Sequence, residues 1–390
     1  MIDWLIIGGG IHGVHLACVL LGKAGVTPER LRILDPHERL LARWETCTAA
    51  TGMAFLRSTA VHHVALDPHD LWNYARRHGV GEHAFLGRYQ RPALDLFCDH
   101  ARAQITAFGL DRLHVRGRAG ALQRTATGWA VESDQGRLEA RRVLLAISVS
   151  EQPRWPAWAA TLRAAGGPVW HLYEAGFQRE CLPQAVSLAV IGGGISAAQV
   201  ALALARDTPG RVTLLMRHPL RIADFDSPPG WLGPKELRGF LAEPNLERRR
   251  AMIAGARQPG SVPDDVARAL RRAEQEGVLQ VRRDEVQNAR LRADGAVDLE
   301  LAGDVLQADG VLLATGFEQH RPGGAWLDAA IATYALPLAP CGYPRVDRTL
   351  RWAPGLYVTG ALAELELGPA ARNIAGARHA GERLVTAAAL

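Results

Sequence analysis

Two glycine-rich segments of the sequence have the residue types and spacing that bind the pyrophosphate of a dinucleotide. In the first, Gly8, Gly10 and Gly13 follow a short apolar run and precede a segment with helical spacing. The first glycine permits a tight turn, the second lets the backbone approach the phosphates, and the third lets the helix pack on the strand. Asp35 ends the next apolar run, where an acid can accept hydrogen bonds from ribose hydroxyls. We therefore expect a dinucleotide at this motif.

The second segment, with Gly192, Gly194 and Ala197, repeats the first in mid-chain. The apolar run that follows it ends in Arg217, whereas the first unit has an acid at that place. An arginine can pair with a ribose 2′-phosphate through two hydrogen bonds, and a carboxylate would repel it. The motif therefore favours NADPH over NADH, with Arg221 assisting. The alternative is an ordinary surface arginine in a chain whose positive charge is nearly all arginine.

Each motif sits in a strand–helix–strand pattern, which is typical of a parallel sheet. We call the parts of the chain built around the two motifs the first unit and the second unit. We therefore expect an α/β fold with two Rossmann-like dinucleotide-binding domains in three layers, the second inserted into the first. The expected divisions are the first part of the first dinucleotide-binding domain, a linker, the second, NAD(P)H-binding domain and the second part of the first domain, at residues 1–150, 151–184, 185–304 and 305–390. A helix is expected within 262–276, a buried strand within 355–360, and a long helix after Pro369.

Composition excludes several other classes of protein. The chain has 390 residues, a net charge of +5 and 22% charged residues, which is ordinary for a globular protein. The arginines at 248–250 are interpreted as a solvated helix face, so no nucleic-acid partner is expected. The five cysteines include no close pair, so neither a disulfide scaffold nor a metal site is expected. Glycines interrupt the apolar stretch 2–21, so we expect a cytoplasmic protein that does not cross a membrane.

The two motifs, together with Ala314-Thr315-Gly316 at the end of a later apolar run, resemble the class B flavin-dependent monooxygenases. The stretch Phe55-Leu56-Arg57-Ser58, followed by Asp67-Pro68, is similar to a segment of the N-hydroxylating lysine and ornithine monooxygenases of siderophore pathways. Arg57 falls where that family has a substrate-contacting lysine. The loop after it is about three residues longer here, and no glutamine stands just before it. The chain is therefore identified as a divergent branch, and the family's usual amino-acid substrate does not follow.

The resemblance implies FAD at the first motif and NADPH at the second. It also implies the reaction: a flavin C4a-peroxide formed with O2 oxygenates, by N-hydroxylation, a small amine or amino-acid-like metabolite. The alternative is an NAD(P)H-dependent flavin reductase or oxidase that passes electrons onward without inserting oxygen. A protein that only senses nucleotides is a third hypothesis, against which the two intact motifs count. Association into a homo-oligomer is left open.

The expected site residues fall into three groups. FAD is expected to contact Gly8, Gly10, Ile11, His12, Gly13, Asp35, Pro36, Trp44, Leu56, Arg57, Gly360, Gly368 and Pro369. NADPH is expected to contact Gly192, Gly194, Ile195, Ser196, Ala197, Arg217, Arg221, Thr315 and Gly316. The catalytic candidates are Arg57, His62, His63 and Asn373. Adjacent residues in an extended segment point to opposite faces, so we expect only one of the two histidines to line the site. The side chains of His12 and His15 are expected to be satisfied packing residues.

Overall fold

The computed structural model describes residues 2–183 and 186–388, so the expected domain boundary at 184 and 185 lies outside the described residues. The first sheet has the strand order β19-β20-β8-β1-β2-β5, and the hairpin of β6 and β7 extends it beside β8. Its strands are β1 (Ile2–Ile7), β2 (Leu31–Asp35), β5 (His114–Arg116), β6 (Ala119–Arg124), β7 (Trp129–Ser133), β8 (Gly136–Leu145), β19 (Arg351–Ala353) and β20 (Leu356–Val358).

Strand β1 lies at the centre of this sheet because it is apolar on both faces. It pairs in parallel with β2 and β8, and Trp4, Leu5 and Ile6 are completely buried. Strands buried on both faces are characteristic of parallel sheets covered by helices. Helix α1 (Ile11–Gly22) begins directly after the first glycine motif and packs against α12 (Ile374–Ala388), near the end of the chain. The expected long helix is thus confirmed, with a 3₁₀ turn at Pro369–Arg372 before it.

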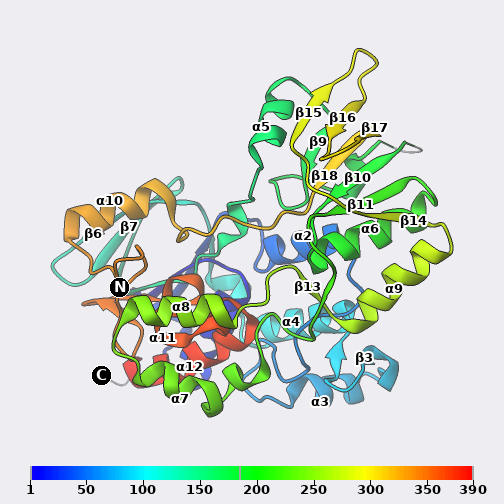
Figure 1. Ribbon diagram of the computed structural model, residues 1–390. Helices are drawn as coiled ribbons and strands as arrows, with labels where there is room; N and C mark the ends of the chain where they lie inside the picture. The colour runs from blue at the N-terminus through cyan, green and yellow to red at the C-terminus, as the bar shows by residue number, and fades with distance from the viewer. Residues whose placement is uncertain (1, 184–185, 389–390) are drawn as a thin grey trace.

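The second sheet has the order β14-β11-β10-β18-β9, and all its pairings are parallel. Its strands are β9 (Val169–His171), β10 (Leu188–Ile191), β11 (Val212–Met216), β14 (Leu279–Arg283) and β18 (Gly310–Leu313). Helices α6 (Ile195–Asp207) and α9 (Asp264–Gln275) pack together beside it (Figure 1). Helix α9 confirms the helix expected within 262–276. The fold class predicted from the two motifs is also confirmed.

The strand pairing differs from the expected divisions of the chain. Strand β9 and helix α5 (Ala157–Ala164) lie in the segment interpreted as a linker, yet β9 pairs with β18 in the second sheet. Strand β18, assigned to the second part of the first domain, pairs with β10. Both strands are only three or four residues long, so their place depends on long-range hydrogen bonds that no local pattern specifies.

Two helices that belong to the second unit in sequence pack against the first unit in space. Helices α7 (Pro234–Ala242) and α8 (Leu246–Ala256) lie beside α11 (Glu364–Leu367) and α12 (Figure 1). The interpretation of residues 248–250 as a solvated face was therefore wrong for two of the three arginines. Only Arg248 is exposed, at 74% of its side chain, whereas Arg249 and Arg250 are at 12% and 24% because they pair with glutamates of α11.

The other elements complete the surface around these two sheets. The helices are α2 (Ala42–Thr51), α3 (Asp70–Arg77), α4 (Leu94–Ala107) and α10 (Gly324–Tyr334). The strands form small sheets: β3 (Phe85–Leu86) with β4 (Arg91–Pro92), β12 (Arg221–Ile222) with β13 (Ser261–Val262), and β15 (Asn288–Leu291), β16 (Val297–Glu300) and β17 (Val305–Ala308) together. Among the described residues, no helix has the length and apolar character needed to cross a membrane.

Candidate active site

The three glycines of the first motif have different roles. Gly8 has a φ of +113°, and a Cβ atom there would lie 2.5 Å from the carbonyl oxygen of Ala146. A Cβ on Gly13 would lie 1.8 Å from the carbonyl oxygen of Gly8. Gly10 has no atom within 4 Å of its Cβ position, so the backbone there is open. The middle glycine is therefore accessible to a phosphate at the N-terminus of α1, and the other two are required by packing.

Asp35 is oriented toward the same turn by two backbone amides. Its Oδ2 accepts a hydrogen bond of 2.6 Å from the Gly9 amide, and its Oδ1 accepts one of 2.9 Å from the His37 amide. A carboxylate has about four acceptor positions, so the ones that remain can accept from ribose hydroxyls. Open space at Gly10 and spare acceptor capacity at Asp35 both fit FAD. By contrast, Leu56, which was expected to contact FAD, is 4% exposed within the hydrophobic core.

His12 connects the first motif to the segment before α12. Its Nε2 lies 3.0 Å from the carbonyl oxygen of Asn373, and its Nδ1 lies 2.9 Å from Thr359 Oγ1. Burial lowers the pKa of His12 to about 4, so the ring is neutral near pH 7. Nε2–H then donates to the carbonyl, and Nδ1 accepts from the threonine hydroxyl. His15 Nδ1 similarly donates to the Val64 carbonyl at 2.9 Å, so the prediction that both histidines are satisfied packing residues is confirmed.

The second motif repeats the packing of the first. A Cβ on Gly192 would lie 2.5 Å from the carbonyl oxygen of Ala314, the same relation that Gly8 has to Ala146. Ser196, in the first turn of α6, accepts a hydrogen bond of 2.5 Å from Tyr173 and retains its own hydroxyl proton for a phosphate. Thr315 instead donates its proton to the carbonyl oxygen of Arg154 at 2.5 Å. The backbone of this turn therefore fits a pyrophosphate, whereas the Thr315 hydroxyl proton already has an acceptor.

Basic side chains stand where a 2′-phosphate would bind in the second unit. Arg217 is 58% exposed, and its ion-pair partner is the equally exposed Glu285 at 3.4 Å. Arg221 donates to a backbone carbonyl at 3.3 Å. The ring of His218 covers Gly193, where a Cβ would lie 2.9 Å from His218 Cε1. His218 was missed by the sequence reasoning, although it stands next to Arg217. These groups fit NADPH, because an exposed guanidinium is free to bind an added phosphate.

Arg57 joins the two units. Its Nε donates to the carbonyl oxygen of Asp224 at 3.0 Å, and its Nη2 donates to the carbonyl of Ala223 at 2.8 Å and to Ser261 Oγ at 2.9 Å. Its Nη1 lies 3.4 Å from the carbonyl oxygen of Ser261. Burial lowers the pKa of this guanidinium, while the charge of Asp226 raises it. Arg57 was expected to contact FAD or substrate, but in the structure its donors bind oxygens of the second unit.

Asn373, another catalytic candidate, reaches the second unit at the same place. Its Nδ2 lies 3.0 Å and 3.1 Å from the two carboxylate oxygens of Asp226. Its carbonyl accepts from His12, so one residue connects the first glycine motif with the loop after β12. The sequence analysis had given Asp226 no role. Arg57, Asp226 and Asn373 therefore meet where the two units face each other.

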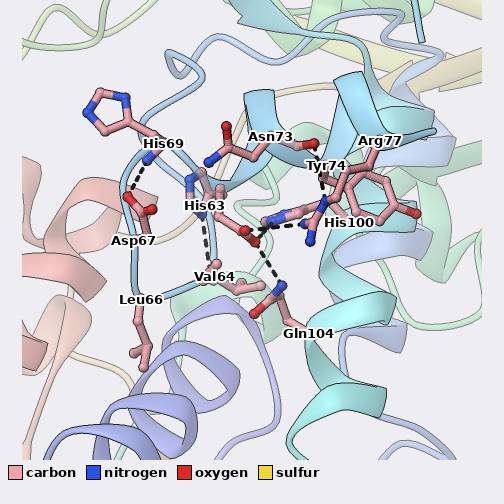
Figure 2. Close-up of polar contacts among 12 residues, drawn as sticks. His63, Val64, Leu66, Asp67, His69, Asn73, Tyr74, Arg77, His100 and Gln104 are labelled. Atoms are coloured by element: carbon pink, nitrogen blue, oxygen red, sulfur yellow. Dashed lines mark hydrogen bonds and ion pairs between the residues drawn. The ribbon is translucent and has the colours of Figure 1, made fainter. Parts of the chain in front are cut away.

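The two adjacent histidines have different environments. His63 donates from Nε2 to the carbonyl of Pro68 at 3.1 Å and accepts at Nδ1 from the Ala65 amide at 3.2 Å. Both ring nitrogens are thus used to fold the loop before α3, beside His100 of α4 (Figure 2). Because both ring nitrogens of His63 already have partners in this loop, His62 is the better candidate of the two to line the site. His62 has a looser contact, at 3.5 Å to Thr59 Oγ1, and burial lowers its pKa to about 4.

Comparisons with known proteins agree with this geometry. Residues 5–150 match an FAD-NAD(P)-binding family model, and residues 107–259 match the L-lysine 6-monooxygenase/L-ornithine 5-monooxygenase model. A comparison with curated protein sequences gave no match.

Three solved structures have the same fold over the whole chain. An ornithine N-hydroxylase from Kutzneria sp. 744 is 18% identical with a TM-score of 0.79, and 99% of it is covered. A cadaverine monooxygenase from Erwinia amylovora, solved with FAD, is 16% identical with a TM-score of 0.76 and is 94% covered. An L-lysine 6-monooxygenase from Pseudomonas syringae is 19% identical with a TM-score of 0.74 and is 99% covered. All three alignments cover 100% of this chain.

At identities of 16–19%, the structural matches establish the fold. The family model concerns the middle of the chain, residues 107–259. The two glycine motifs agree with both. The resemblance expected from the sequence is confirmed: the middle of the chain is similar to the L-lysine 6-monooxygenase/L-ornithine 5-monooxygenase family, and the whole chain has the fold of an ornithine N-hydroxylase and an L-lysine 6-monooxygenase.

Proposed function

We propose that the protein is an FAD- and NADPH-dependent monooxygenase that uses O2 to hydroxylate the nitrogen of a small amine. The observation that carries this proposal is the chain of contacts from His12 through Asn373 to Asp226. It links the first glycine motif to the loop of the second unit, so the two nucleotide sites share one wall. An enzyme that moves a hydride between two nucleotides and then oxygenates a third molecule needs adjacent binding sites for them.

The chain's own residues have limited tasks in this reaction. FAD and NADPH, when bound, supply hydride transfer and oxygen activation. The N-termini of α1 and α6 bind the pyrophosphates, Asp35 binds a ribose, and Arg217 binds the 2′-phosphate. His12 stays neutral and holds α1 to the segment before α12. No paired acid and base are needed, because the reacting oxygen is supplied by the cofactor.

The reductase alternative has no specific support in the structure. The family model matched by residues 107–259 describes monooxygenases, and the three solved structures named above are N-hydroxylases or monooxygenases. The proposal therefore keeps the monooxygenase as its only candidate.

The decisive experiment measures NADPH, oxygen and product together. The purified protein, loaded with FAD, should consume NADPH and O2 and form a hydroxylamine from at least one member of a panel of diamines, monoamines and amino acids. A Gly10→Ala variant serves as the control, since it should fold normally but bind FAD more weakly. NADPH oxidation that yields only hydrogen peroxide with every amine would contradict the proposal.

A further inference from the structure

The middle glycine of the second motif is covered, whereas that of the first motif is open. The two motifs otherwise pack alike, since a Cβ on either Gly8 or Gly192 would lie 2.5 Å from the carbonyl oxygen of an alanine. No neighbouring atom lies within 4 Å of the Cβ position of Gly10, but the Cα atom of Gly260 lies 3.6 Å from the Cβ position of Gly194. A pyrophosphate that approaches Gly194 as another approaches Gly10 therefore meets the backbone at Gly260.

Gly260 belongs to a short segment, residues 257–262, that connects α8 to α9 and that we call the strap. Both ends of the strap are fixed. Arg257 forms an ion pair with the buried carboxylate of Glu364, and Val262 is completely buried in β13. Gly260, between them, has a φ of +72°, which glycine adopts more readily than other residues. The strap therefore crosses the second motif between two fixed ends, and its middle is the part that can move away from the turn.

Two side chains of the second unit contact the middle of the strap. The ring of His218 lies between the strap and the motif, because a Cβ on Gly260 would lie 2.7 Å from its Cε1 and one on Gly193 would lie 2.9 Å from the same atom. Arg221 donates to the carbonyl oxygen of Pro259 at 3.3 Å, and both residues are exposed. Water readily replaces an exposed hydrogen bond, so this contact is weak. A 2′-phosphate that binds Arg221 would remove it altogether.

The firmest attachment of the middle of the strap comes from the first unit. Arg57 donates from Nη2 to Ser261 Oγ at 2.9 Å, and its Nη1 lies 3.4 Å from the carbonyl oxygen of Ser261. Ser261 is 2% exposed, and its hydroxyl donates in turn to the carbonyl oxygen of Gln258 at 2.7 Å. Two further bonds, to backbone carbonyls of the loop after β12, fix the guanidinium itself. Because charged donors form the stronger hydrogen bonds, Arg57 holds the strap where it covers Gly194.

We propose that the strap closes the second nucleotide site when no nicotinamide nucleotide is bound, and that Arg57 is the positioning residue that keeps it closed. NADPH then binds only those molecules whose strap has moved away, so its apparent affinity is lower than the affinity of the open site. The inference rests on the assignment of NADPH to the second motif. Because Arg57 belongs to the first unit, entry of the nucleotide is coupled to the contact between the two units.

Two variants of this contact and one matched control test the inference. Arg57→Met keeps the length of the side chain and removes its donors, and Ser261→Ala removes the acceptor on the strap. Arg91→Met is the control, because Arg91 also joins the first unit to the second, through hydrogen bonds of 3.0 Å and 2.9 Å to Asp265 of α9, outside the strap. Each protein is loaded with FAD, and NADP+ is the probe because it cannot reduce the flavin. The measured quantities are the association rate and dissociation constant of NADP+ and, without nucleotide, the amide hydrogen exchange of residues 257–262.

Removing the contact should improve nucleotide binding, which damage to the structure would not do. In Arg57→Met and Ser261→Ala, the association rate of NADP+ should rise and its dissociation constant should fall about fivefold, because more molecules have an open strap. Amide exchange in the strap should quicken by a similar factor before any nucleotide is added. Arg91→Met should stay within about twofold of the wild type in all three measurements. Ser261→Ala provides the same test if Arg57→Met does not fold.

The failure of the inference can be told apart from the failure of the proposed function. Wild-type values of NADP+ binding and strap exchange in both variants would overturn the inference and leave the function intact. An equal gain in Arg91→Met would also overturn it, by showing a general loosening between the units. A raised amine KM in Arg57→Met with unchanged NADP+ binding would assign Arg57 to the substrate instead. If the wild type neither binds NADP+ nor consumes NADPH, the proposed function is wrong, and the exchange measurement still decides whether Arg57 holds the strap.

Discussion

Arg250 of α8 forms an ion pair with Glu364 of α11, whose side chain is completely buried. The same guanidinium lies over the ring of Tyr343, with its Cζ 3.9 Å from the ring centroid. Arg257 and Arg372 also pair with Glu364. A helix pair inserted in the second unit is thereby fixed to the segment just before α12, which is the segment expected to contact the flavin.

Breaking this pair should destabilise the protein far more than removing a neighbouring arginine. Arg250→Ala should lower the free energy of unfolding by about 3 kcal/mol, because it leaves part of a buried charge uncompensated. Arg248→Ala removes the same type of side chain two residues earlier, where it is 74% exposed, and should change stability by less than about 0.5 kcal/mol. Chemical denaturation of both FAD-loaded variants checks the difference. Similar losses in the two would show that the buried cluster is not important for stability.

The ion pairs around Glu364 should also make the stability of the protein depend on pH in the acidic range. Burial raises the pKa of Glu364, but the charges of Arg257, Arg372 and Arg250 outweigh it and bring the pKa from 4.5 to about 2. A depressed carboxyl pKa contributes stability that is complete above pH 4.5 and is lost as the pH falls toward 2. The loss should be on the order of 3 kcal/mol. Melting temperatures of the wild type and Glu364→Gln, measured from pH 6 to pH 2, should therefore differ most at pH 6 and converge toward pH 2. Parallel curves would show that the ion pairs of Glu364 do not cause the loss of stability in acid.

Gly10→Ala should weaken cofactor binding, whereas Gly13→Ala should impair folding. A Cβ at Gly10 meets no protein atom, so Gly10→Ala should fold normally and bind FAD at least about tenfold more weakly, since the methyl group fills the approach to the phosphates. A Cβ at Gly13 would lie 1.8 Å from a carbonyl oxygen, so Gly13→Ala should reduce the yield of folded protein. Circular dichroism and flavin titration distinguish the two outcomes. Normal FAD affinity in Gly10→Ala would contradict the assignment of this turn to the cofactor.

Substitutions of Arg217 and Glu285 should change the KM for NADPH in opposite directions. Arg217→Ala should raise the KM for NADPH about tenfold and leave that for NADH nearly unchanged, because only NADPH carries the 2′-phosphate. Glu285→Gln removes the carboxylate 3.4 Å from Arg217 and should lower the KM for NADPH about twofold. Steady-state kinetics with both nucleotides tests the pair. Equal effects of Arg217→Ala on NADPH and NADH would exclude Arg217 as the 2′-phosphate ligand.

Much of the fold could be predicted because its signals are local. Gly8 and Gly192 are required by close contact with the residues just after β8 and β18, and Gly13 by close contact with Gly8, so the motifs indicate both the turn and the helix after it. The same holds for α9 and α12, whose residues carry helical periodicity and start signals. The placement of β9 and β18 in the second sheet could not be predicted, since short strands are selected by partners more than 20 residues away.

The sequence by itself determined two dinucleotide units, the acid at Asp35 and the arginine at 217, because each depends on a few consecutive residues and on φ angles open to glycine. Only the tertiary structure decided which polar groups meet. Arg57 binds oxygens more than 160 residues away, Asn373 reaches Asp226 across 147 residues, and His63 uses both ring nitrogens within its own loop. The physical reason is that a hydrogen-bond partner is set by the packing of whole units, whereas a glycine turn is set by local sterics.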